Sequence, residues 1–387
     1  MPIKTKSRQP PVFVLTNRLH TSGFYPILAS IMTSKTNLID KIFIVVLGVA
    51  LLIPMSHINT DEKSATENRM LAARPKLFMP ELNNKFGIEY DAWFSDRFFG
   101  RNQLIKLYSR QAGATGNVQV LVENDNWLFY KLGDSMRNFS NIDKFTDEQL
   151  YQIQNYLTDI NNWCKKHNKK FVFFIAPDKN KIYGEYITKV AKKYPDTESR
   201  SQQLVNWLRK NSDVPVVYPY DELHANKNIG LLYFKNDTHW NKLGAYIGYK
   251  TIMRALNITP IAYKNLVETK YPNGDLTNMN TALPPDNATI YNVPDIVEIC
   301  PFATRDDTHC ENKHPAINAS VFTYRDSFSI ALGPYYTNTF NSVDSRWRAD
   351  VRLVDLEYIK NNNIDIVIFE IVERNLSGLP YQKFPKD

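Results

Sequence analysis

The pattern of apolar and polar residues divides this chain into three parts. The first, residues 1–58, begins with a polar, basic stretch and continues into Ile42–Met55, an apolar run without a charge. The second, residues 59–140, has an irregular pattern, and we expect it to pack on the main domain as an N-terminal extension. The third, residues 141–387, has a regular alternation of strand-length and helix-length patterns and is the predicted main domain.

Within the main domain, the apolar run Phe171–Ile175 has the composition of a parallel strand that is buried on both faces. Further strands are predicted over 214–218, 321–324 and 364–371, and helices over 146–167, 199–211, 245–256, 328–338 and 350–361. Thr146 is the expected N-cap of the first helix. Strands that alternate with helices indicate an α/β sandwich with a mostly parallel sheet.

Residues 258–318 interrupt this alternation and are rich in Pro, Asn and Asp, so we expect a long, irregular excursion. Two of the three cysteines, Cys300 and Cys310, lie in it. Outside the cytosol they can close a short loop and leave Cys164 free, whereas inside it three unpaired thiols are expected. No cysteine pair has zinc-finger spacing, so we expect no structural metal.

The apolar run Ile42–Met55 has a length between that of a signal-peptide core and a minimal membrane span. No small-x-small cleavage site follows it. We therefore interpret the run as an uncleaved membrane anchor, with the basic N-terminus in the cytoplasm and residues from about 59 onward across the membrane. The alternative is a buried core helix. Translation from Met32 would leave a short basic lead before the run, so residues 1–31 are a candidate over-extended gene start.

Composition narrows the class of protein. Hydrophobic residues make up 43% of the chain and charged residues 22%, so the chain can bury a core and is not of disordered type. A net charge of +7 permits attraction to nucleic acid or to an acidic polysaccharide. Because Lys and Arg are scattered and not interleaved with aromatic residues, no nucleic-acid partner is expected. The 22 tyrosines suit sugar rings as well as a core.

The candidate chemistry begins with Asp237 and His239, which stand two residues apart where an apolar run gives way to a helical pattern. In extended backbone the two side chains share a face, so the carboxylate can fix the imidazole tautomer and leave Nε2 as a general base. Ser327 lies in a sharp turn between a strand and a helix, at the carboxyl edge of the sheet. Backbone donors there can stabilise an oxyanion. The simpler interpretations are a surface Asp–His pair and a helix-capping serine.

The string Asp307-Thr308-His309 repeats the same three residue types. We expect it to lie in the irregular excursion, with no strand before it, so that nothing holds the imidazole rigidly. His309 and His314 lack a third well-spaced ligand, and no metal site is expected there.

Three strings resemble, in this order, the AlgX/AlgJ-type family of SGNH-hydrolase-like proteins: Asp-Thr-His-Trp-Asn-x-x-Gly-Ala at 237–245, Arg-Asp-Ser-Phe at 325–328 and the segment Ile366–Arg374. Shorter matches occur at 67–69, 99–101, 127–129 and 176–185. The resemblance spans about residues 67 to 376. It implies an SGNH-hydrolase-like three-layer sandwich and a periplasmic O-acetyltransferase that acts on an exopolysaccharide such as alginate.

By position, the resemblance makes Ser327 the acetyl-accepting nucleophile, His239 its base and Asp237 the residue that orients His239. It implies no cofactor and no metal. Arg325 stands where the family usually has Gly, so its side chain is expected to restrict the turn before Ser327. The candidates for a substrate contact or a second oxyanion donor are Tyr324, Arg346 and Trp347, and the simpler interpretation of each is a packing or surface role.

The resemblance also implies partners and a location. A membrane-bound O-acyltransferase would supply the acetyl group, and the chain would cross the inner membrane of a Gram-negative bacterium once, with its catalytic domain in the periplasm. Two alternatives stay open. One is a polysaccharide acetylesterase that uses the same triad with water as acceptor, and the other is a non-catalytic polysaccharide-binding subunit of an export complex.

Overall fold

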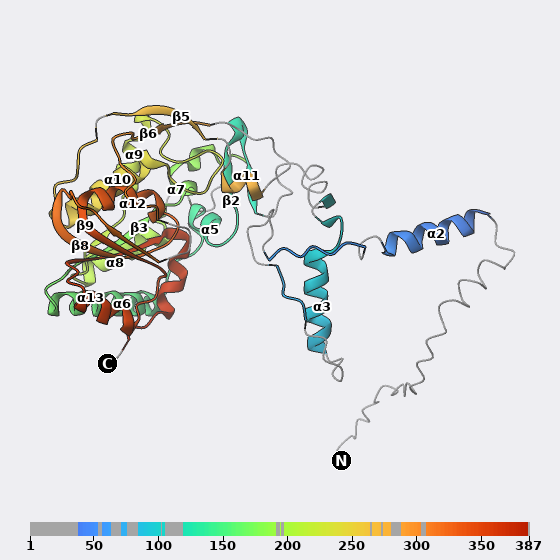
Figure 1. Ribbon diagram of the computed structural model, residues 1–387, viewed down its shortest axis with the longest axis horizontal. Coiled ribbons are helices and arrows are strands. Elements are labelled where there is room, and N and C mark those ends of the chain that lie inside the picture. The colour runs from blue at the N-terminus through green and yellow to red at the C-terminus, as the bar shows by residue number, and fades with distance from the viewer. Residues whose placement is uncertain are drawn as a thin grey trace, which may run out of the picture. The chain divides into compact units, whose positions relative to one another are not determined.

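The computed structural model describes residues 38–52, 56–62, 71–75, 84–101, 103–104, 119–190, 194, 197–263, 265–271, 274–279, 288–302 and 307–385 (Figure 1). The question of translation from Met1 or Met32 lies outside these residues. Contacts divide the chain into two units, one of residues 1–61 and 72–101, the other of residues 62–71 and 102–387.

The second unit is built around a six-stranded sheet with the strand order β4-β3-β10-β8-β9-β7. Its strands are β3 (Lys170–Ala176), β4 (Val216–Val217), β7 (Thr308–Glu311), β8 (Ile317–Arg325), β9 (Phe340–Trp347) and β10 (Ile366–Val372). All neighbouring strands pair in parallel except β7, which runs antiparallel to β9. The prediction of a mostly parallel sheet is confirmed.

Helices cover both faces of this sheet (Figure 1). On one face lie α6 (Asp147–Lys166), α8 (Arg200–Asn211) and α13 (Leu353–Asn361), and on the other lie α10 (Lys242–Ala255) and α12 (Ser329–Thr339). Side chains alternate along a strand, so Phe171 and Phe173 of β3 pack with α6. The intervening Val172 and Phe174 pack with α10. This is the expected three-layer sandwich.

The sequence predicted Thr146 as the N-cap of α6, and the structure confirms it. Thr146 and Gln149 form a capping box, in which Gln149 N donates to Thr146 Oγ1 at 3.2 Å and Thr146 N donates to Gln149 Oε1 at 3.0 Å. The box satisfies donors that would otherwise be left without partners at the helix start. The helix therefore begins where the sequence predicts it.

Residues 119–140, which the sequence pattern placed in the N-terminal extension, belong to the second unit. They form β1 (Val120–Val122), β2 (Leu128–Tyr130) and α5 (Ser135–Phe139). Trp127 and Phe129 are 1% and 0% exposed and join the same hydrophobic cluster as Phe174 of β3. Two short helices, α7 (Lys179–Ile182) and α9 (Tyr220–Ala225), complete this side of the sheet.

The described part of the excursion at 258–318 is more ordered than its composition predicts. It contains β5 (Val267–Tyr271) paired with β6 (Ala288–Asn292), helix α11 (Asp275–Met279) and the edge strand β7. The expectation that no strand holds His309 was wrong, because His309 lies in β7 opposite Asp344 of β9, with Nδ1 2.9 Å from Asp344 Oδ1. Cys300 and Cys310 form a disulfide, and Cys164 is free and buried.

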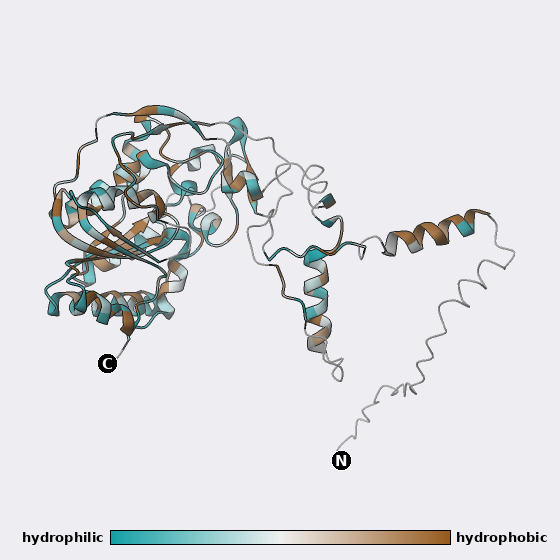
Figure 2. Ribbon diagram, in the orientation of Figure 1, coloured by the Kyte–Doolittle hydropathy of each residue, from teal (hydrophilic) through white to brown (hydrophobic). Residues whose placement is uncertain are grey.

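The first unit contains helices α2 (Leu38–Leu52) and α3 (Asn84–Arg97). Figure 2 shows α2 as hydrophobic along most of its length, and its side chains are exposed, Phe43 by 63% and Val46 by 59%. Among the residues that the structure describes, no helix has both the length and the apolar character needed to cross a membrane. In α3, Arg97 donates to the carbonyls of Asn59 at 2.9 Å and Asp61 at 2.6 Å.

Candidate active site

Asp237, His239 and Ser327 form one hydrogen-bonded chain at the carboxyl edge of the sheet. His239 Nδ1 lies 2.6 Å from Asp237 Oδ1, and His239 Nε2 lies 2.7 Å from Ser327 Oγ. When Nδ1–H donates to the carboxylate, Nε2 is left to accept a hydrogen bond from the serine hydroxyl. The structure thus brings together two segments that lie far apart in the sequence.

The loop before α10 holds His239 by local hydrogen bonds. Asp237 Oδ1 also accepts the backbone N–H of His239 at 2.9 Å, which forms a tight turn of the kind that Asp favours. Asn241 caps α10, because its side chain accepts from Gly244 N at 3.1 Å. A Cβ at Gly244 would lie 2.3 Å from the carbonyl oxygen of Leu232, so only glycine fits the helix start against this loop.

Carboxylates fix the turn that carries Ser327. The Asp326 carboxylate accepts from Phe328 N at 3.0 Å and from Val372 N at 2.8 Å, which ties the turn to the end of β10. Glu370 Oε2 accepts from Asp326 N at 2.9 Å and from Ser329 Oγ at 2.8 Å. Burial raises the pKa of Glu370 well above its usual value, and the charge of Asp326 raises it further.

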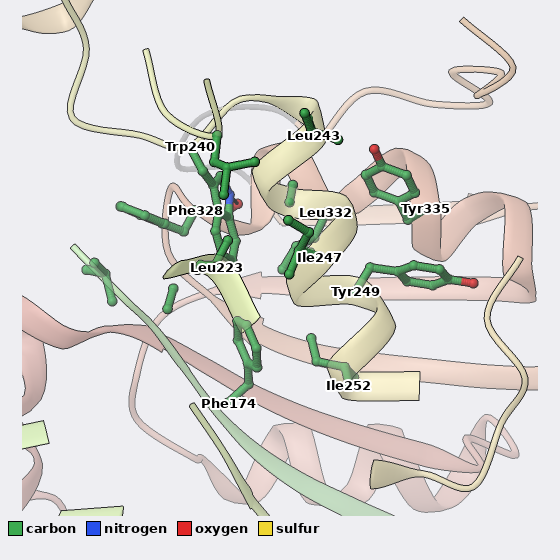
Figure 3. Packing of buried hydrophobic residues seen from close by; sticks show 14 of the residues in the cluster. Phe174, Leu223, Trp240, Leu243, Ile247, Tyr249, Ile252, Phe328, Leu332 and Tyr335 are labelled. Carbon is green, nitrogen blue, oxygen red and sulfur yellow. Dashed lines mark hydrogen bonds between the residues drawn. The ribbon is translucent and has the colours of Figure 1, made fainter. Parts of the chain in front are cut away.

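Two aromatic side chains join the histidine loop to the serine turn (Figure 3). The indole N–H of Trp240 donates to the carbonyl of Phe328 at 2.9 Å, and the two rings lie 5.3 Å apart. The Phe328 ring also lies 5.1 Å from the His239 imidazole. This packing fixes the loop and the turn against each other, which keeps the imidazole in reach of the serine.

The charges of the pair reinforce this geometry. Burial alone would raise the pKa of Asp237, but the charge of His239 and the hydrogen bond to it outweigh burial and hold that pKa well below its usual value. Burial alone would lower the pKa of His239, but the Asp237 carboxylate outweighs burial and raises it. Asp237 is therefore ionised, and His239 retains its proton to a higher pH than a free histidine.

Asp275, at the start of α11, is a member of this site that the sequence reasoning missed. Its backbone N–H donates to Asp237 Oδ2 at 2.9 Å, and its carboxylate accepts from Thr238 N at 2.8 Å and from Thr238 Oγ1 at 2.6 Å. A Cβ at Gly274 would lie 2.1 Å from the carbonyl oxygen of Asn236, so the close approach requires glycine. The Gly-Asp string marks a turn in the sequence, but nothing in it points to His239.

Asp237, His239 and Asp275 present ligand atoms within 4.8 Å of one another, close enough for a metal ion. Both oxygens of Asp237 and both of Asp275 already accept hydrogen bonds from protein groups. Hydrogen bonding alone therefore accounts for this cluster, and the expected absence of a metal stays a prediction.

Lys179, in the segment after β3, is a second missed residue. Its ammonium donates to three backbone carbonyls, those of Phe234 at 3.1 Å, Lys235 at 3.0 Å and Asp237 at 2.5 Å. Burial lowers the pKa of Lys179 to about 7. The lysine holds the loop that leads into His239. It lies in the resembling string at 176–185, but that string gave no hint of its partner.

Two of the three predicted substrate contacts lie away from the site. Tyr324 is 1% exposed and packs with Phe322 and Phe369 on the α6 face of the sheet. Arg346 stacks over Phe322 at 5.1 Å and over Tyr358 at 4.9 Å on that same face. Successive side chains of a strand point to opposite faces of the sheet, and those of Tyr324 and Arg346 point to the face that α6 covers. Nearness to Ser327 in the sequence did not show which face each side chain would take.

Trp347, the third candidate, lines a pocket of about 640 Å³ together with Arg325, Asp326 and Arg374. The Arg325 guanidinium is held between the rings of Phe302 at 5.1 Å and Trp347 at 5.0 Å, and its Nε donates to Ser345 Oγ at 3.0 Å. Arg325 does not have a positive φ, so its backbone does not require glycine. Its side chain becomes part of the pocket wall.

Comparison with known proteins places this architecture in a family. The family model described as "SGNH hydrolase-like domain, acetyltransferase AlgX" matches residues 120–316, just over half of the chain. The chain belongs to this family. Asp237 and His239 lie inside the matched segment, and Ser327 follows it.

Individual relatives are distant. The chain is 24% identical over 201 residues to the probable alginate O-acetylase AlgJ of Pseudomonas putida, which covers 49% of each chain, so it spans about half the length of this curated relative. Among solved structures it resembles PatB1 of Bacillus cereus, with 20% identity, a TM-score of 0.47 and coverage of 66% of this chain and 96% of that one. It also resembles the O-acetyltransferase domain of P. putida AlgJ, with 19% identity, a TM-score of 0.41 and coverage of 69% and 94%.

Proposed function

We propose that this chain is an O-acetyltransferase that modifies an exopolysaccharide through an acetyl-serine intermediate. Ser327 is the nucleophile, His239 the general base and Asp237 the carboxylate that orients and charges the imidazole. The observation that carries the proposal is the 2.7 Å contact between His239 Nε2 and Ser327 Oγ. The other ring nitrogen of His239 contacts Asp237 at the same time. Membership of the AlgX family supports the class of reaction.

The reaction has two steps. In the first, Ser327 Oγ attacks the carbonyl carbon of an acetyl donor while His239 Nε2 takes the hydroxyl proton and then delivers it to the leaving group. The Ser327 backbone N–H, which donates to none of the described residues, is available to the developing oxyanion. In the second step, His239 takes the proton of a sugar hydroxyl as the hydroxyl oxygen bonds to the acetyl carbonyl carbon. The ester bond to Ser327 Oγ then breaks, and Oγ takes the proton from His239.

The pocket of about 640 Å³ that Arg325 and Asp326 line, next in the chain to Ser327, is the proposed site of the acceptor sugar, whose reacting hydroxyl would extend from it to Ser327. Trp347 offers a ring on which a sugar can stack, and Asp350 offers a carboxylate that accepts hydrogen bonds from sugar hydroxyls. Of the substrate contacts expected from the sequence, Trp347 is the one that this proposal keeps.

The proposed location is the periplasmic side of the inner membrane of a Gram-negative bacterium, with the apolar run Ile42–Met55 as anchor. The exposed apolar side chains of α2 support an apolar environment for that helix, and the Cys300–Cys310 disulfide supports an oxidising compartment. A membrane-bound O-acyltransferase is the proposed source of the acetyl group.

The test is turnover of p-nitrophenyl acetate, with and without an oligosaccharide acceptor. Ser327→Ala and His239→Ala should each reduce turnover by about 10³-fold or more while leaving the melting curve unchanged. His309→Ala is the matched control, because His309 also has an aspartate partner at 2.9 Å but, in the described part of the chain, no hydrogen bond to a serine. It should keep wild-type turnover.

The same assay separates the alternatives. Acetylated oligosaccharide in the products supports transfer, and acetate release that no sugar affects points to the esterase. If Ser327→Ala turns over as fast as wild type, both enzymatic functions fail, and a polysaccharide-binding subunit becomes the better proposal.

A further inference from the structure

Arg374 is a largely buried cation beside the proposed site. The two steps described above give it no role. It follows β10 in the 3₁₀ segment η6 (Glu373–Tyr381). Its guanidinium carbon lies 5.2 Å from the ring centroid of Phe328, the residue after Ser327. The same ring lies 5.1 Å from the His239 imidazole, so the cation, the base and the nucleophile turn meet around one phenyl ring.

A single ion pair sets the orientation of this guanidinium. Arg374 Nη1 donates to Asp178 Oδ1, and the Asp178 side chain is 3% exposed and also accepts from Ser135 Oγ at 3.3 Å. Among the described residues, Asp178 is the only acceptor of a hydrogen bond from Arg374. The Arg374 side chain is 15% exposed and lines the pocket, so its remaining N–H groups are available to a bound molecule.

Arg374 stays protonated in this position. Burial alone would lower the pKa of the guanidinium, but the carboxylates of Asp178 and Asp326 outweigh burial and raise it. The cation in turn acts on His239, whose pKa it lowers against the larger effect of Asp237. A fixed charge that acts on His239 can also act on the oxyanion that forms on the carbonyl oxygen of the acetyl group bonded to Ser327.

We propose that Arg374 is a further catalytic residue, which binds the acetyl carbonyl oxygen as it becomes an oxyanion, together with the Ser327 N–H. As Ser327 Oγ bonds to the carbonyl carbon of an acetyl ester, the π electron pair moves onto the oxygen and the hydroxyl proton passes to His239. The pair returns when the bond to the donor oxygen breaks and that oxygen takes the proton. Donors that are fixed before the reaction stabilise this charge without reorganisation. The inference rests on the proposed nucleophile.

The test compares Arg374 variants of the full chain in the hydrolysis of p-nitrophenyl acetate. Arg374→Gln should lower kcat about 10²- to 10³-fold with little change in KM, because the lost interaction exists only in the transition state. Arg374→Lys should recover part of this loss, since it keeps the charge but not the fork of N–H groups. Guanidinium ion added to Arg374→Ala should restore part of the turnover.

Arg200→Gln is the matched control. The Arg200 side chain is 8% exposed and pairs with Asp134 and Asp143, and its guanidinium packs on Phe145 rather than on Phe328. A purely structural role would give both variants a lower melting temperature and an unchanged kcat per folded molecule. A specific fall in kcat for Arg374→Gln alone supports the inference.

The outcomes are distinguishable. If Arg374→Gln keeps kcat within about threefold of wild type while Ser327→Ala is inactive, the inference is overturned and the proposed function stands. If Ser327→Ala is as active as wild type, both fall. If Arg374→Gln does not fold, Arg374→Lys decides, because a folded lysine variant with full kcat overturns the inference and one with reduced kcat supports it.

Discussion

At the scale of single residues, the relation between Asp237 and His239 determines how activity should depend on pH. A general base works when it is neutral, and the pKa of His239 is raised above its ordinary value of about 6.5. Turnover should therefore rise with pH through a midpoint above 6.5. Asp237→Asn removes the charge that raises this pKa, so the midpoint should move to lower pH, and kcat should fall by about 10³- to 10⁴-fold.

The measurement is kcat/KM for p-nitrophenyl acetate from pH 5 to 9. Asp275→Asn is the companion variant, because the Asp275 carboxylate lies 3.6 Å from His239 Nδ1 and raises the same pKa less than Asp237 does. It should shift the midpoint in the same direction by a smaller amount. An Asp237→Asn profile with the wild-type midpoint would show that His239 is not the titrating base.

The sequence predicted the residues of this site where a local string carries the geometry. Asp237 and His239 are joined by a turn that their own spacing forms, and Ser327 sits in a strand-to-helix turn. Asp275 and Arg374 could not be found in this way, because each reaches the site from a distant segment through tertiary contacts. Tyr324 was proposed because it is close to Ser327 in the sequence. Side chains alternate along the strand, however, and that of Tyr324 packs in the core on the α6 face of the sheet.

At the scale of elements, Lys179 connects the segment after β3 to the loop before α10. Lys179→Met keeps the length of the side chain but removes all three hydrogen bonds to the loop carbonyls. Without them His239 loses its fixed position, and we expect kcat to fall about 10- to 100-fold. Lys169→Met is the control, because Lys169 donates to the single carbonyl of Ile364, far along the sheet from the site. It should leave kcat unchanged.

The burial of the Lys179 ammonium should also make the free energy of unfolding depend on pH. Burial lowers its pKa to about 7 in the native state, against about 10.4 in the unfolded chain, so the native state binds fewer protons between these values. The free energy of unfolding should therefore gain up to about 2 kcal/mol from this group between pH 7 and 9, and the gain should be absent from Lys179→Met. Urea unfolding of both proteins at the two pH values measures it. Equal pH dependence in the two proteins would contradict the assignment.

Elements were predicted well where hydrophobic patterning and caps agree. Helix α6 has both an amphipathic face and a capping box, β3 is a continuous apolar run after Lys170, and β10 is apolar except for Glu370. Strands β7 and β9 escaped prediction, because β7 has four residues of which only Cys310 is buried, and β9 reads as Phe-Asn-Ser-Val-Asp-Ser-Arg-Trp. Polar residues of β9 are buried against partners from other elements; Ser345, for example, accepts a hydrogen bond from Arg325 of β8. A local sequence pattern does not reveal such partners.

At the scale of the whole molecule, the chain contains a three-layer α/β unit and a first unit that includes α2. The predicted boundary at residue 140 differs from the division by contacts, because β1 and β2 share the core of the main unit. The apolar side chains of α2 are exposed in the described structure, and such a surface is stable in water only if something covers it. A membrane is the cover that the basic flank of the run favours.

If the apolar run anchors the chain, the full chain should fractionate with the membranes of bacterial cells. The wild-type chain should stay with the membranes after extraction at alkaline pH, and replacement of both Val45 and Val46 by Asp should release it. Each carboxylate in an apolar run costs about 2.5 to 3.5 kcal/mol on insertion, so two should abolish anchoring. Ile88→Asp in α3, where Ile88 is 70% exposed, adds charge to an exposed apolar position outside the run and should leave the chain in the membranes. Release of the wild-type chain by alkaline extraction, or retention of the double Asp variant, would show that the run does not anchor the protein.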